Sequence, residues 1–157
     1  MASTITAATI TVKISESIKL NGSQQGGTNT FTIADINNVS KRIINITTSE
    51  RTIINMGTNP GAGMFIESEV RYIRITNKDN AYHVGLIFQN ENNDEFGVKL
   101  DWGQSFIYNA DRAGGVVDTM DAVDNDGLST NTFADLVSIT AIADTAAVDL
   151  EIFVASV

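Results

Sequence analysis

The sequence lacks cysteine altogether and contains a single histidine and a single proline in 157 residues. Without cysteine, disulfide bonds, thiolate metal sites and thiol catalysis are excluded, and the lack of disulfides fits a protein made in a reducing compartment. A serine–histidine–aspartate triad would have to use His83, but no Gly-x-Ser-x-Gly motif is present to supply its nucleophile. Because His83 alternates with the apolar Tyr82 and Val84, we expect a surface side chain, and we predict that the protein is not an enzyme.

Charged residues are scarce and unevenly distributed. They make up 18% of the chain, below the usual share of about 25%, and the formal net charge is −9. All ten basic residues and eleven acidic ones occur up to Arg112, whereas the eight remaining acidic residues follow it with no basic residue among them. Since an acidic segment repels phosphate backbones, nucleic acid is not expected as a partner. The acidic segment is either a solvated face or a contact for a cation or a basic protein surface.

Signals for export and for membrane insertion are also missing. Residues 1–8 have neither the basic start nor the apolar centre of a secretory signal. No apolar run approaches the roughly 20 residues that a membrane helix needs. We therefore expect no ordinary export and no membrane partner.

Threonine, isoleucine, valine and phenylalanine are abundant, together with asparagine and glycine. The first group favours strands and the second favours turns. Along much of the chain apolar and polar residues alternate with period two, which predicts half-buried strands. The predicted strands cover residues 8–20 (with a bend or bulge near 15–17), 31–33, 42–48, 52–56, 70–76, 82–89, 96–102, 105–108, 136–143 and 147–155.

Polar and glycine-rich stretches predict the loops. Residues 21–29 contain no apolar side chain, and residues 35–40 resemble a turn. Pro60 and Gly61, inside the loop 57–63, suit the corners of a type II turn. Residues 110–132 are expected to form a long loop, with or without one short helix.

Short connections between alternating strands predict which strands are neighbours. The strands 42–48 and 52–56 are expected to pair across Ser49 and Glu50. The four strands between residues 70 and 108 are expected to form an antiparallel meander. Asp144 and Thr145 are expected to turn a final hairpin.

Together these patterns predict one all-β domain spanning residues 1–157, with residues 1–8 as a flexible N-terminal arm. About nine or ten one-sided strands with little helix are most simply buried in an antiparallel β-sandwich, which we expect to be jelly-roll-like. A single closed sheet is the alternative. Flexible stretches at residues 1–8 or 21–29 are expected to become ordered on assembly.

An acidic cluster within residues 110–132 is the candidate metal site. Its ligands would be Asp118, Asp121, Asp124 and Asp126. Carboxylates on a loop suit Ca²⁺, but an EF-hand alignment fails because it places Ala122 at the first position and Phe133 at the twelfth. The two alternatives are a calcium site of another kind and a solvated acidic loop, and no other cofactor is expected.

Aromatic residues offer a different candidate site. Trp102, Tyr72, Tyr82 and Tyr108 could form a platform on which a sugar stacks. Trp102 and Tyr82, however, have the parity of the apolar faces of their strands, which favours packing in the core or in an interface.

Acidic pairs and glycine-rich loops give weaker signals. Glycosidase chemistry needs two carboxylates across a cleft, but Glu67 with Glu69 and Asp94 with Glu95 are expected to be solvated side chains near strand ends. The glycine pairs at 26–27 and 114–115 lack the following Lys-Ser/Thr of a phosphate-binding loop.

Four segments resemble a known class of proteins: residues 16–22 (ESIKLNG), 70–77, 100–108 and the closing 148–156. Together they resemble small β-rich accessory virion proteins of tailed bacteriophages, notably those of marine hosts. The resemblance implies a structural protein that decorates or cements a capsid, with a neck, tail or fibre component as an alternative. It also implies self-association, for instance as a trimer, docking on major capsid or tail proteins, and a place in a virion assembled in the host cytoplasm. From the residues alone, a carbohydrate- or calcium-binding β-sandwich module is the other alternative.

Overall fold

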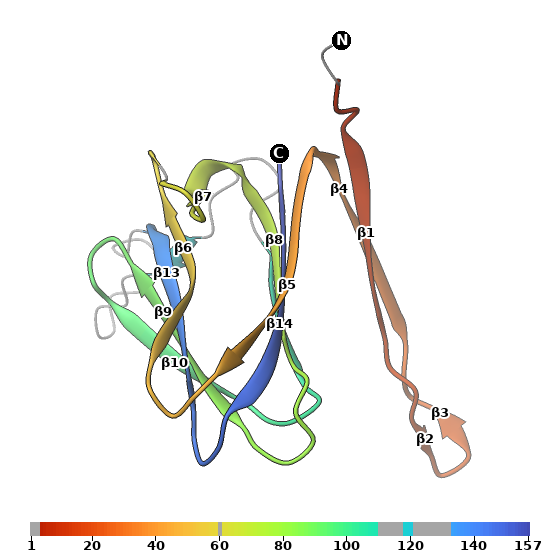
Figure 1. Cartoon of the computed structure of the whole chain (residues 1–157). Helices are drawn as coiled ribbons and strands as arrows, with labels where there is room; N and C mark the ends of the chain where they lie inside the picture. The colour runs from red at the N-terminus through yellow and green to blue at the C-terminus, as the bar shows by residue number, and fades with distance from the viewer. Residues whose placement is uncertain (1–3, 60, 110–117, 121–132) are drawn as a thin grey trace.

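The computed structural model describes residues 4–59, 61–109, 118–120 and 133–157 (Figure 1). Strands dominate its regular structure, and the helices of the described residues amount to one 3-10 turn, η1 at Glu67–Glu69. None of these ranges holds a helix of the length and apolar character that crossing a membrane requires. In chain order the strands are β1 (Ala8–Ser15), β2 (Lys19–Leu20), β3 (Ser23–Gln24), β4 (Thr28–Ile36), β5 (Asn38–Ile46), β6 (Arg51–Gly57), β7 (Phe65–Ile66), β8 (Val70–Asn77), β9 (Val84–Asn90), β10 (Glu95–Leu100), β11 (Ser105–Asn109), β12 (Asp118–Met120), β13 (Phe133–Ala143) and β14 (Val148–Ser156).

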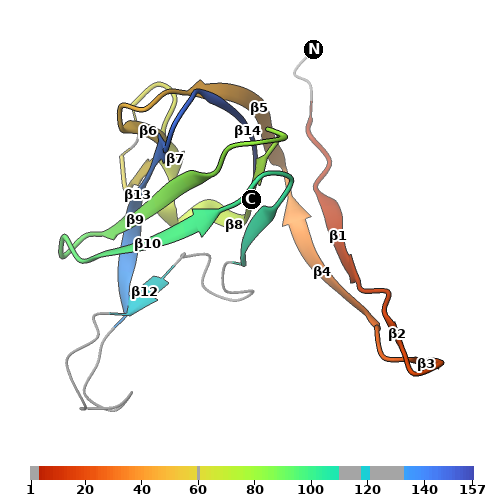
Figure 2. The same cartoon turned by 90° about the horizontal axis from the view of Figure 1, so that it is seen from below.

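Two sheets packed face to face form the body of the molecule (Figures 1 and 2). The six-stranded sheet has the order β10-β9-β13-β6-β7, with β12 paired to β13, and the four-stranded sheet has the order β11-β8-β14-β5. The strand pairs are antiparallel apart from the short parallel contact between β6 and β7. The predicted all-β, antiparallel sandwich-like class is therefore confirmed.

The core lies between the two sheets and is built from alternate residues of their strands. On β9, Val84, Leu86 and Phe88 are fully buried, whereas the intervening Gly85 and Ile87 are only partly covered. Each fully buried aliphatic or aromatic side chain contributes roughly 1.5–3 kcal/mol to folding. Because this burial requires strict alternation, the period-two pattern located the central strands well.

The predicted neighbours are wrong wherever the chain crosses between sheets. Of the four strands expected to form a meander, only β9 and β10 pair in sequence, while β8 and β11 pair with each other in the opposite sheet. The strands β5 and β6 also lie in different sheets, and so do β13 and β14, so neither predicted hairpin forms. Facing sheets are only about 10 Å apart, so a short polar loop can either turn back within one sheet or arch across to the other.

Four such arches close the same end of the sandwich, at the bottom of Figure 1. They are residues 47–50, 78–83, 101–104 and 144–147. Backbone hydrogen bonds join them to neighbouring strands and to one another, as from Asp144 N to His83 O (3.4 Å) and from Gly103 N to Asn77 O (3.1 Å). We call this end of the molecule the arch end.

The N-terminal region differs most from the prediction. Residues 21–29 are not one open loop, because Asn21 and Gly22 turn the chain between β2 and β3 with φ of 49° and 81°. Two successive positive φ values are those of a type I′ hairpin turn, which Asn-Gly favours. The expected turn at 35–40 is much shorter than predicted, because the chain reverses sharply between β4 and β5 and only Asn37 separates the two strands (Figure 1). The predicted break after Ser15 does occur, because β1 ends there.

Together β1 and β4, with β2 and β3 at the tip, form a long hairpin that leaves the sandwich beside the four-stranded sheet (Figure 1). We call this hairpin, residues 8–36, the arm. Of the N-terminal stretch expected to be flexible, residues 1–3 lie outside the described residues. Pro60 and most of the long 110–132 segment lie outside them too.

Candidate functional site

The base of the arm is attached to the outer face of the four-stranded sheet. A small apolar cluster joins Val12, Ile33 and Ile36 of the arm to Tyr72 of β8 and Ala155 of β14. Partly buried side chains surround this cluster: Ile10, Phe31, Ile107, Phe153 and Val157. A backbone hydrogen bond from Asn37 N to Ser156 O (3.1 Å) joins the end of the arm to β14 at the same place. The arm is thus held at its base by side chains and backbone together.

Beyond this cluster the arm carries its apolar side chains into solvent. Ile14, Ile18 and Leu20 are 38%, 56% and 59% exposed. Viewed from below, the tip with β2 and β3 points away from the sandwich (Figure 2). A two-stranded hairpin with no sheet or helix packed on it is only marginally stable in water, so the outer part of the arm gains stability from any surface that covers these side chains.

The outer part of the arm is nevertheless an ordered hairpin in this structure. Glu16 N donates to Gly27 O (2.8 Å) and Gln25 N donates to Ile18 O (2.9 Å). At Gly26 a Cβ atom would lie 2.2 Å from the carbonyl oxygen of Glu16, so only glycine fits there. The two sides of the arm therefore approach one another closely between β1 and the tip.

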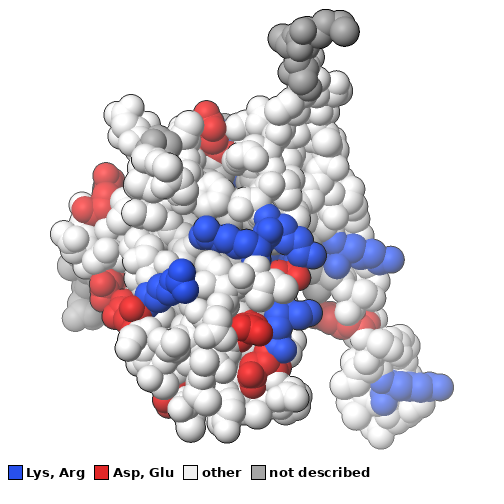
Figure 3. All heavy atoms as spheres, viewed as in Figure 1, with Lys and Arg blue, Asp and Glu red and all other residues white. Residues whose placement is uncertain are grey.

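The arm carries few charged side chains, and Figure 3 shows basic ones on the arm and at its tip. Its charged residues are Lys13, Lys19, Glu16 and Asp35, which balance, so the formal net charge of −9 belongs to the rest of the chain. On the sandwich, basic side chains form a band across the middle of this face with acidic side chains around it (Figure 3). A formally neutral arm with exposed apolar side chains can approach an acidic body without the net repulsion that two acidic bodies would experience.

A polar cluster stabilises the outer face of the four-stranded sheet beside the arm. Glu151 of β14 binds Arg74 Nη2 (2.7 Å) and Lys41 Nζ (3.4 Å), and the Arg74 guanidinium lies 5.9 Å from the centre of the Phe153 ring. The hydrogen bond from Arg74, together with Lys41, lowers the pKa of the Glu151 carboxyl below its ordinary value of 4.5. The Glu151 carboxylate is thus paired within the chain, and the cluster as a whole has two basic groups to one acidic group.

The outer face of the six-stranded sheet is hollowed where two glycines leave it without side chains. The hollow has a volume of about 530 Å³ and is lined by Gly85, Gly97, Ile87, Ile142 and Lys99, among other residues. A Cβ on Gly85 would meet the Cγ2 atom of Ile142 at 3.4 Å. The lining contains no tryptophan, tyrosine or phenylalanine, and the imidazole of His83 is the one ring among its residues.

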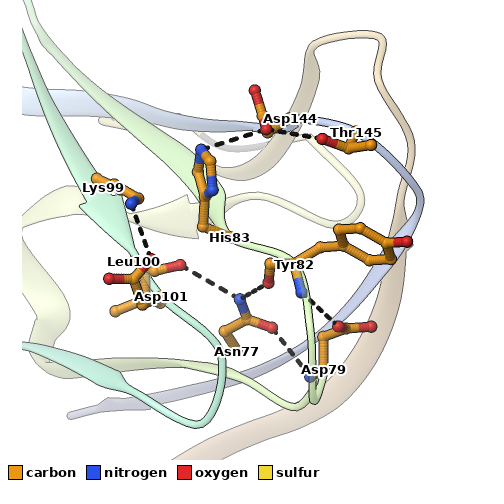
Figure 4. A network of polar contacts seen from close by, with 9 residues as sticks. All are labelled: Asn77, Asp79, Tyr82, His83, Lys99, Leu100, Asp101, Asp144 and Thr145. Atoms are coloured by element: carbon orange, nitrogen blue, oxygen red, sulfur yellow. Dashed lines mark hydrogen bonds and ion pairs between the residues drawn. The ribbon is translucent and has the colours of Figure 1, made fainter.

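His83 lies at the edge of this hollow. Its side chain is about one-third exposed, at 34%, and its Nε2 atom is 3.8 Å from Asp144 Oδ2 (Figure 4). Val84 on one side of it is fully buried, but Tyr82 on the other side is 40% exposed, so the predicted alternation holds on one side of His83 only. The Asp144 carboxylate also accepts a hydrogen bond from Thr145 Oγ1 (2.8 Å).

For Tyr82 and Trp102, parity predicted packing in the core or in an interface, and the first of these two alternatives is wrong. Tyr82 is 40% exposed and Trp102 is 59% exposed, so neither is packed in the core. The ladder between β9 and β10 ends at the pair Val84 and Leu100, and both aromatic residues follow in the arches beyond that pair. By sequence alternation Tyr82 and Trp102 belong to the core-facing side of their strands. Beyond the pair Val84 and Leu100, however, the opposite sheet no longer covers that side. Tyr72 and Tyr108, in contrast, are packed: Tyr72 against Phe153 and Tyr108 against Phe88.

One buried side chain, Asn77 at the end of β8, joins the arches that carry Tyr82 and Trp102 (Figure 4). Its Nδ2 atom donates to Tyr82 O (2.9 Å) and to Leu100 O (3.2 Å). Its Oδ1 atom accepts from Asp79 N (2.9 Å), and its backbone binds Gln104 O and Gly103 N. Sequence reasoning missed Asn77, because nothing distinguishes it from the many asparagines of this chain.

Of the predicted calcium ligands, Asp118 lies in β12, which pairs with β13, and Asp121, Asp124 and Asp126 lie outside the described residues. Within the described ranges, no three histidine or acidic side chains form a group suited to a metal ion. The predicted calcium site therefore stays a prediction, since the described residues do not test it.

The predicted acidic pairs lie at the end opposite the arches. Glu67 and Glu69 form η1, and burial together with Asp135 and Glu91 raises the pKa of Glu67. Asp94 accepts a hydrogen bond from Asn90 (3.3 Å), and Glu95 accepts one from Gln89 (3.0 Å). Both residues of the second pair thus bind neighbours of the β9–β10 hairpin.

Comparisons with protein-family models, with curated proteins and with solved structures found no match to this chain. The case for its function therefore depends on the residues and geometry described above.

Proposed function

We propose that this chain is a structural protein of a virus particle, of the kind that decorates or cements a capsid, and that it acts by self-association and by docking through its arm. The observation that carries the proposal is the exposed row of Ile14, Ile18 and Leu20 on an ordered hairpin outside the sandwich. Exposed apolar patches on an otherwise polar protein mark interaction sites. An arm that is ordered but uncovered in the single chain suits insertion against a neighbouring subunit.

The strand order supports a jelly-roll description of the body. Of the eight strands from β5 to β14, leaving aside the short β7 and β12, the first lies beside the last in one sheet, and the second lies beside the seventh in the other. Each sheet then continues with two more strands, giving orders that correspond to two interlocked Greek keys. Jelly rolls of this kind occur in viral capsid proteins and in lectins. The analogy concerns fold alone and is weaker support than the arm.

The resemblance to accessory virion proteins of tailed bacteriophages adds a location. Its first segment, residues 16–22, forms the outer part of the arm, and its second and fourth coincide with β8 and β14, which carry the base of the arm. Three of the four resembling segments therefore lie in the proposed docking element or at its base. A neck, tail or fibre component would use the same arm, and the proposal includes it as the alternative location.

The direct test is the composition of virus particles. Quantitative mass spectrometry of purified particles should find this chain in many copies per particle, in a fixed ratio to the major capsid protein. A low fixed copy number per particle would indicate that the protein belongs to the neck or tail. Absence from particles that still accumulate the free protein in the infected cell would overturn the proposal.

A further inference from the structure

Strand β10 forms one edge of the six-stranded sheet (Figure 2). Among the described strands it pairs with β9 alone, and that ladder runs without a bulge. Just before β10, Asn90 N donates to Asp94 O (3.1 Å), so this pair is a hydrogen-bonded one. Because hydrogen-bonded and non-hydrogen-bonded pairs alternate along an antiparallel ladder, the backbone groups of Glu95, Gly97 and Lys99 point away from β9. β10 therefore offers a straight edge on which another strand can pair.

The other side of the sandwich, where β5 and β6 lie, is bridged by arginine side chains instead. Arg42 of β5 donates to the carbonyl oxygen of Ile53 in β6, and Arg51 of β6 donates to Asn45 O in β5 (3.4 Å). Charged side chains across an edge hinder the approach of a further strand. No arginine of the described residues binds the backbone of β10 in this way.

Opposite charges on β10 are placed symmetrically about a glycine. Glu95 lies two residues before Gly97 and Lys99 two residues after it, so all three share the outer face of the strand. Glu95 accepts a hydrogen bond from Gln89 (3.0 Å), and Lys99 forms an ion pair with Asp101 (3.0 Å). Both contacts are exposed, and exposed pairs contribute little to stability. The two charged side chains can therefore exchange these partners at little cost.

The charges favour one register for the antiparallel pairing of two copies of β10. When the Gly97 residues of the two copies lie opposite each other, Glu95 of each copy faces Lys99 of the other. A shift that places Glu95 opposite Glu95, or Lys99 opposite Lys99, sets like charges against each other, which destabilises a ladder, whereas opposite charges stabilise it. The favoured register is self-complementary, so a two-fold axis passes through the pair of Gly97 residues.

The core-facing side of β10 supplies an apolar contact in the same register. The Phe96 ring stacks on Phe88, with ring centres 4.6 Å apart, yet Phe96 remains 40% exposed. Phe96 of each copy would lie opposite the partly buried Val98 of the other. These are non-hydrogen-bonded pairs, in which opposed side chains approach most closely. The pairing therefore covers an exposed ring as well as joining the two backbones.

We propose that two copies of this chain pair edge to edge through β10, antiparallel about Gly97, so that their six-stranded sheets continue across the contact. The pairing follows from β10, while its place in a particle rests on the proposed function. One strand from each copy makes a small contact of the kind typical of transient encounters, and the acidic bodies repel each other. The contact therefore acts between chains that the arm has already brought together, where their local concentration is high.

The test is disulfide trapping, which the lack of cysteine in the chain makes specific. A Cβ atom on Gly97 would meet no neighbour closer than Leu86 O (3.8 Å), so Gly97→Cys should keep the fold. Opposed Cα atoms of a hydrogen-bonded pair are about 5.5 Å apart, within reach of a disulfide. Mild oxidation of the full-length Gly97→Cys protein in concentrated solution should therefore give linked dimers on a non-reducing gel.

Glu95→Cys and Lys99→Cys are the matched controls on the same face of the strand. In the proposed register each cysteine lies about 14 Å from its own counterpart, so each variant alone should give at least about fivefold less dimer than Gly97→Cys. The two positions lie opposite each other, so an equimolar mixture of the two variants should give the mixed dimer, identified by its mass. The mixture leaves Gly97 unchanged and decides the question alone if Gly97→Cys is unstable.

Charge reversal tests the register. In the Gly97→Cys protein, Glu95→Lys sets two lysines opposite each other and should lower the dimer yield about threefold or more. The exchanged variant Glu95→Lys/Lys99→Glu again sets opposite charges against each other and should restore the yield.

The edge contact is overturned by a stable Gly97→Cys protein that gives no more dimer than Glu95→Cys, or by a mixture that gives no mixed dimer. An exchanged variant that yields as little dimer as Glu95→Lys would overturn the register. If trapping fails while association through the arm persists, the edge contact is lost and the proposed function stands. If trapping succeeds but the chain is absent from virus particles, the edge contact stands and the proposed function fails.

Discussion

Asn77 shows how much of the arch end depends on one side chain. It is fully buried and polar, and both donors of its amide, its amide oxygen and its backbone groups are all hydrogen-bonded. A buried amide with fewer partners would cost more than it contributes. The amide joins the ends of β8 and β10, which lie in different sheets, at the point where both strands give way to arches.

We expect Asn77→Ala to lower the free energy of unfolding by about 2–3 kcal/mol, because Tyr82 O, Leu100 O and Asp79 N lose their partner. The measurement is urea unfolding followed by circular dichroism. Asn80→Ala is the matched control, since Asn80 is an exposed asparagine of the same arch, and it should change stability by less than about 0.5 kcal/mol. Equal effects of the two substitutions would contradict the role assigned to Asn77.

Tyr82 and Trp102 show where single-residue reasoning from sequence stops. Alternation correctly gives them the parity of the core face, but it does not say where the opposing sheet ends. Val84 and Leu100, the last residues that pair between β9 and β10, are both buried. Tyr82 and Trp102, two residues further along each chain segment, are exposed to solvent. The exposure of an aromatic residue here thus depends on whether the opposite sheet packs against it, and the sequence period does not show this.

At the scale of elements, short sequence signals specify the hairpin of the arm, although the overall composition of its tip does not suggest strands. Residues 21–29 are polar throughout and therefore suggest an open loop. Within them, Asn21-Gly22 supplies the two positive φ values of a tight turn, and Gly26 allows the close approach to Glu16. The Asn-Gly pair is a known hairpin signal and could have located this turn.

We expect Gly26→Ala to open the outer part of the arm, because its Cβ would collide with the backbone of Glu16. Hydrogen exchange should then show faster exchange of the amides of Glu16 and Gln25, with the strands of the sandwich still protected. Gly27→Ala is the control, since a Cβ there meets nothing within 4 Å, and it should leave the exchange of both amides unchanged. Loss of protection in both variants, or in neither, would argue against this packing.

Strand positions could be predicted from the sequence, but strand partners could not. The segments 70–76 and 105–108 were located within a residue or two as β8 and β11, because one-sided burial imposes period two. That β8 pairs with β11 across an intervening hairpin depends on arches, whose sequences resemble hairpin loops. The candidate calcium cluster was predicted from residues that lie mostly outside the described part, so it stays a prediction.

For the whole molecule, the distribution of charge explains why an arm would serve assembly. The chain outside the arm carries the full formal charge of −9, so two bodies repel each other as they approach. The arm is formally neutral and exposes Ile18 and Leu20 at its outer end. Contact through the arm buries apolar surface without bringing the two acidic bodies face to face. This account predicts association that depends on the arm and is strengthened by salt, which screens the repulsion between bodies.

The most direct test of this account is the solution mass of the protein by light scattering. One chain has a mass of 16.9 kDa. The wild type should have a mass of at least twice this value, with a trimer as the expected form. The variant Ile18→Ser/Leu20→Ser should fall to the mass of one chain, while Trp102→Ala should keep the wild-type mass. A wild-type protein that stays at the mass of one chain at every concentration, or an arm variant that assembles like the wild type, would contradict assembly through the arm.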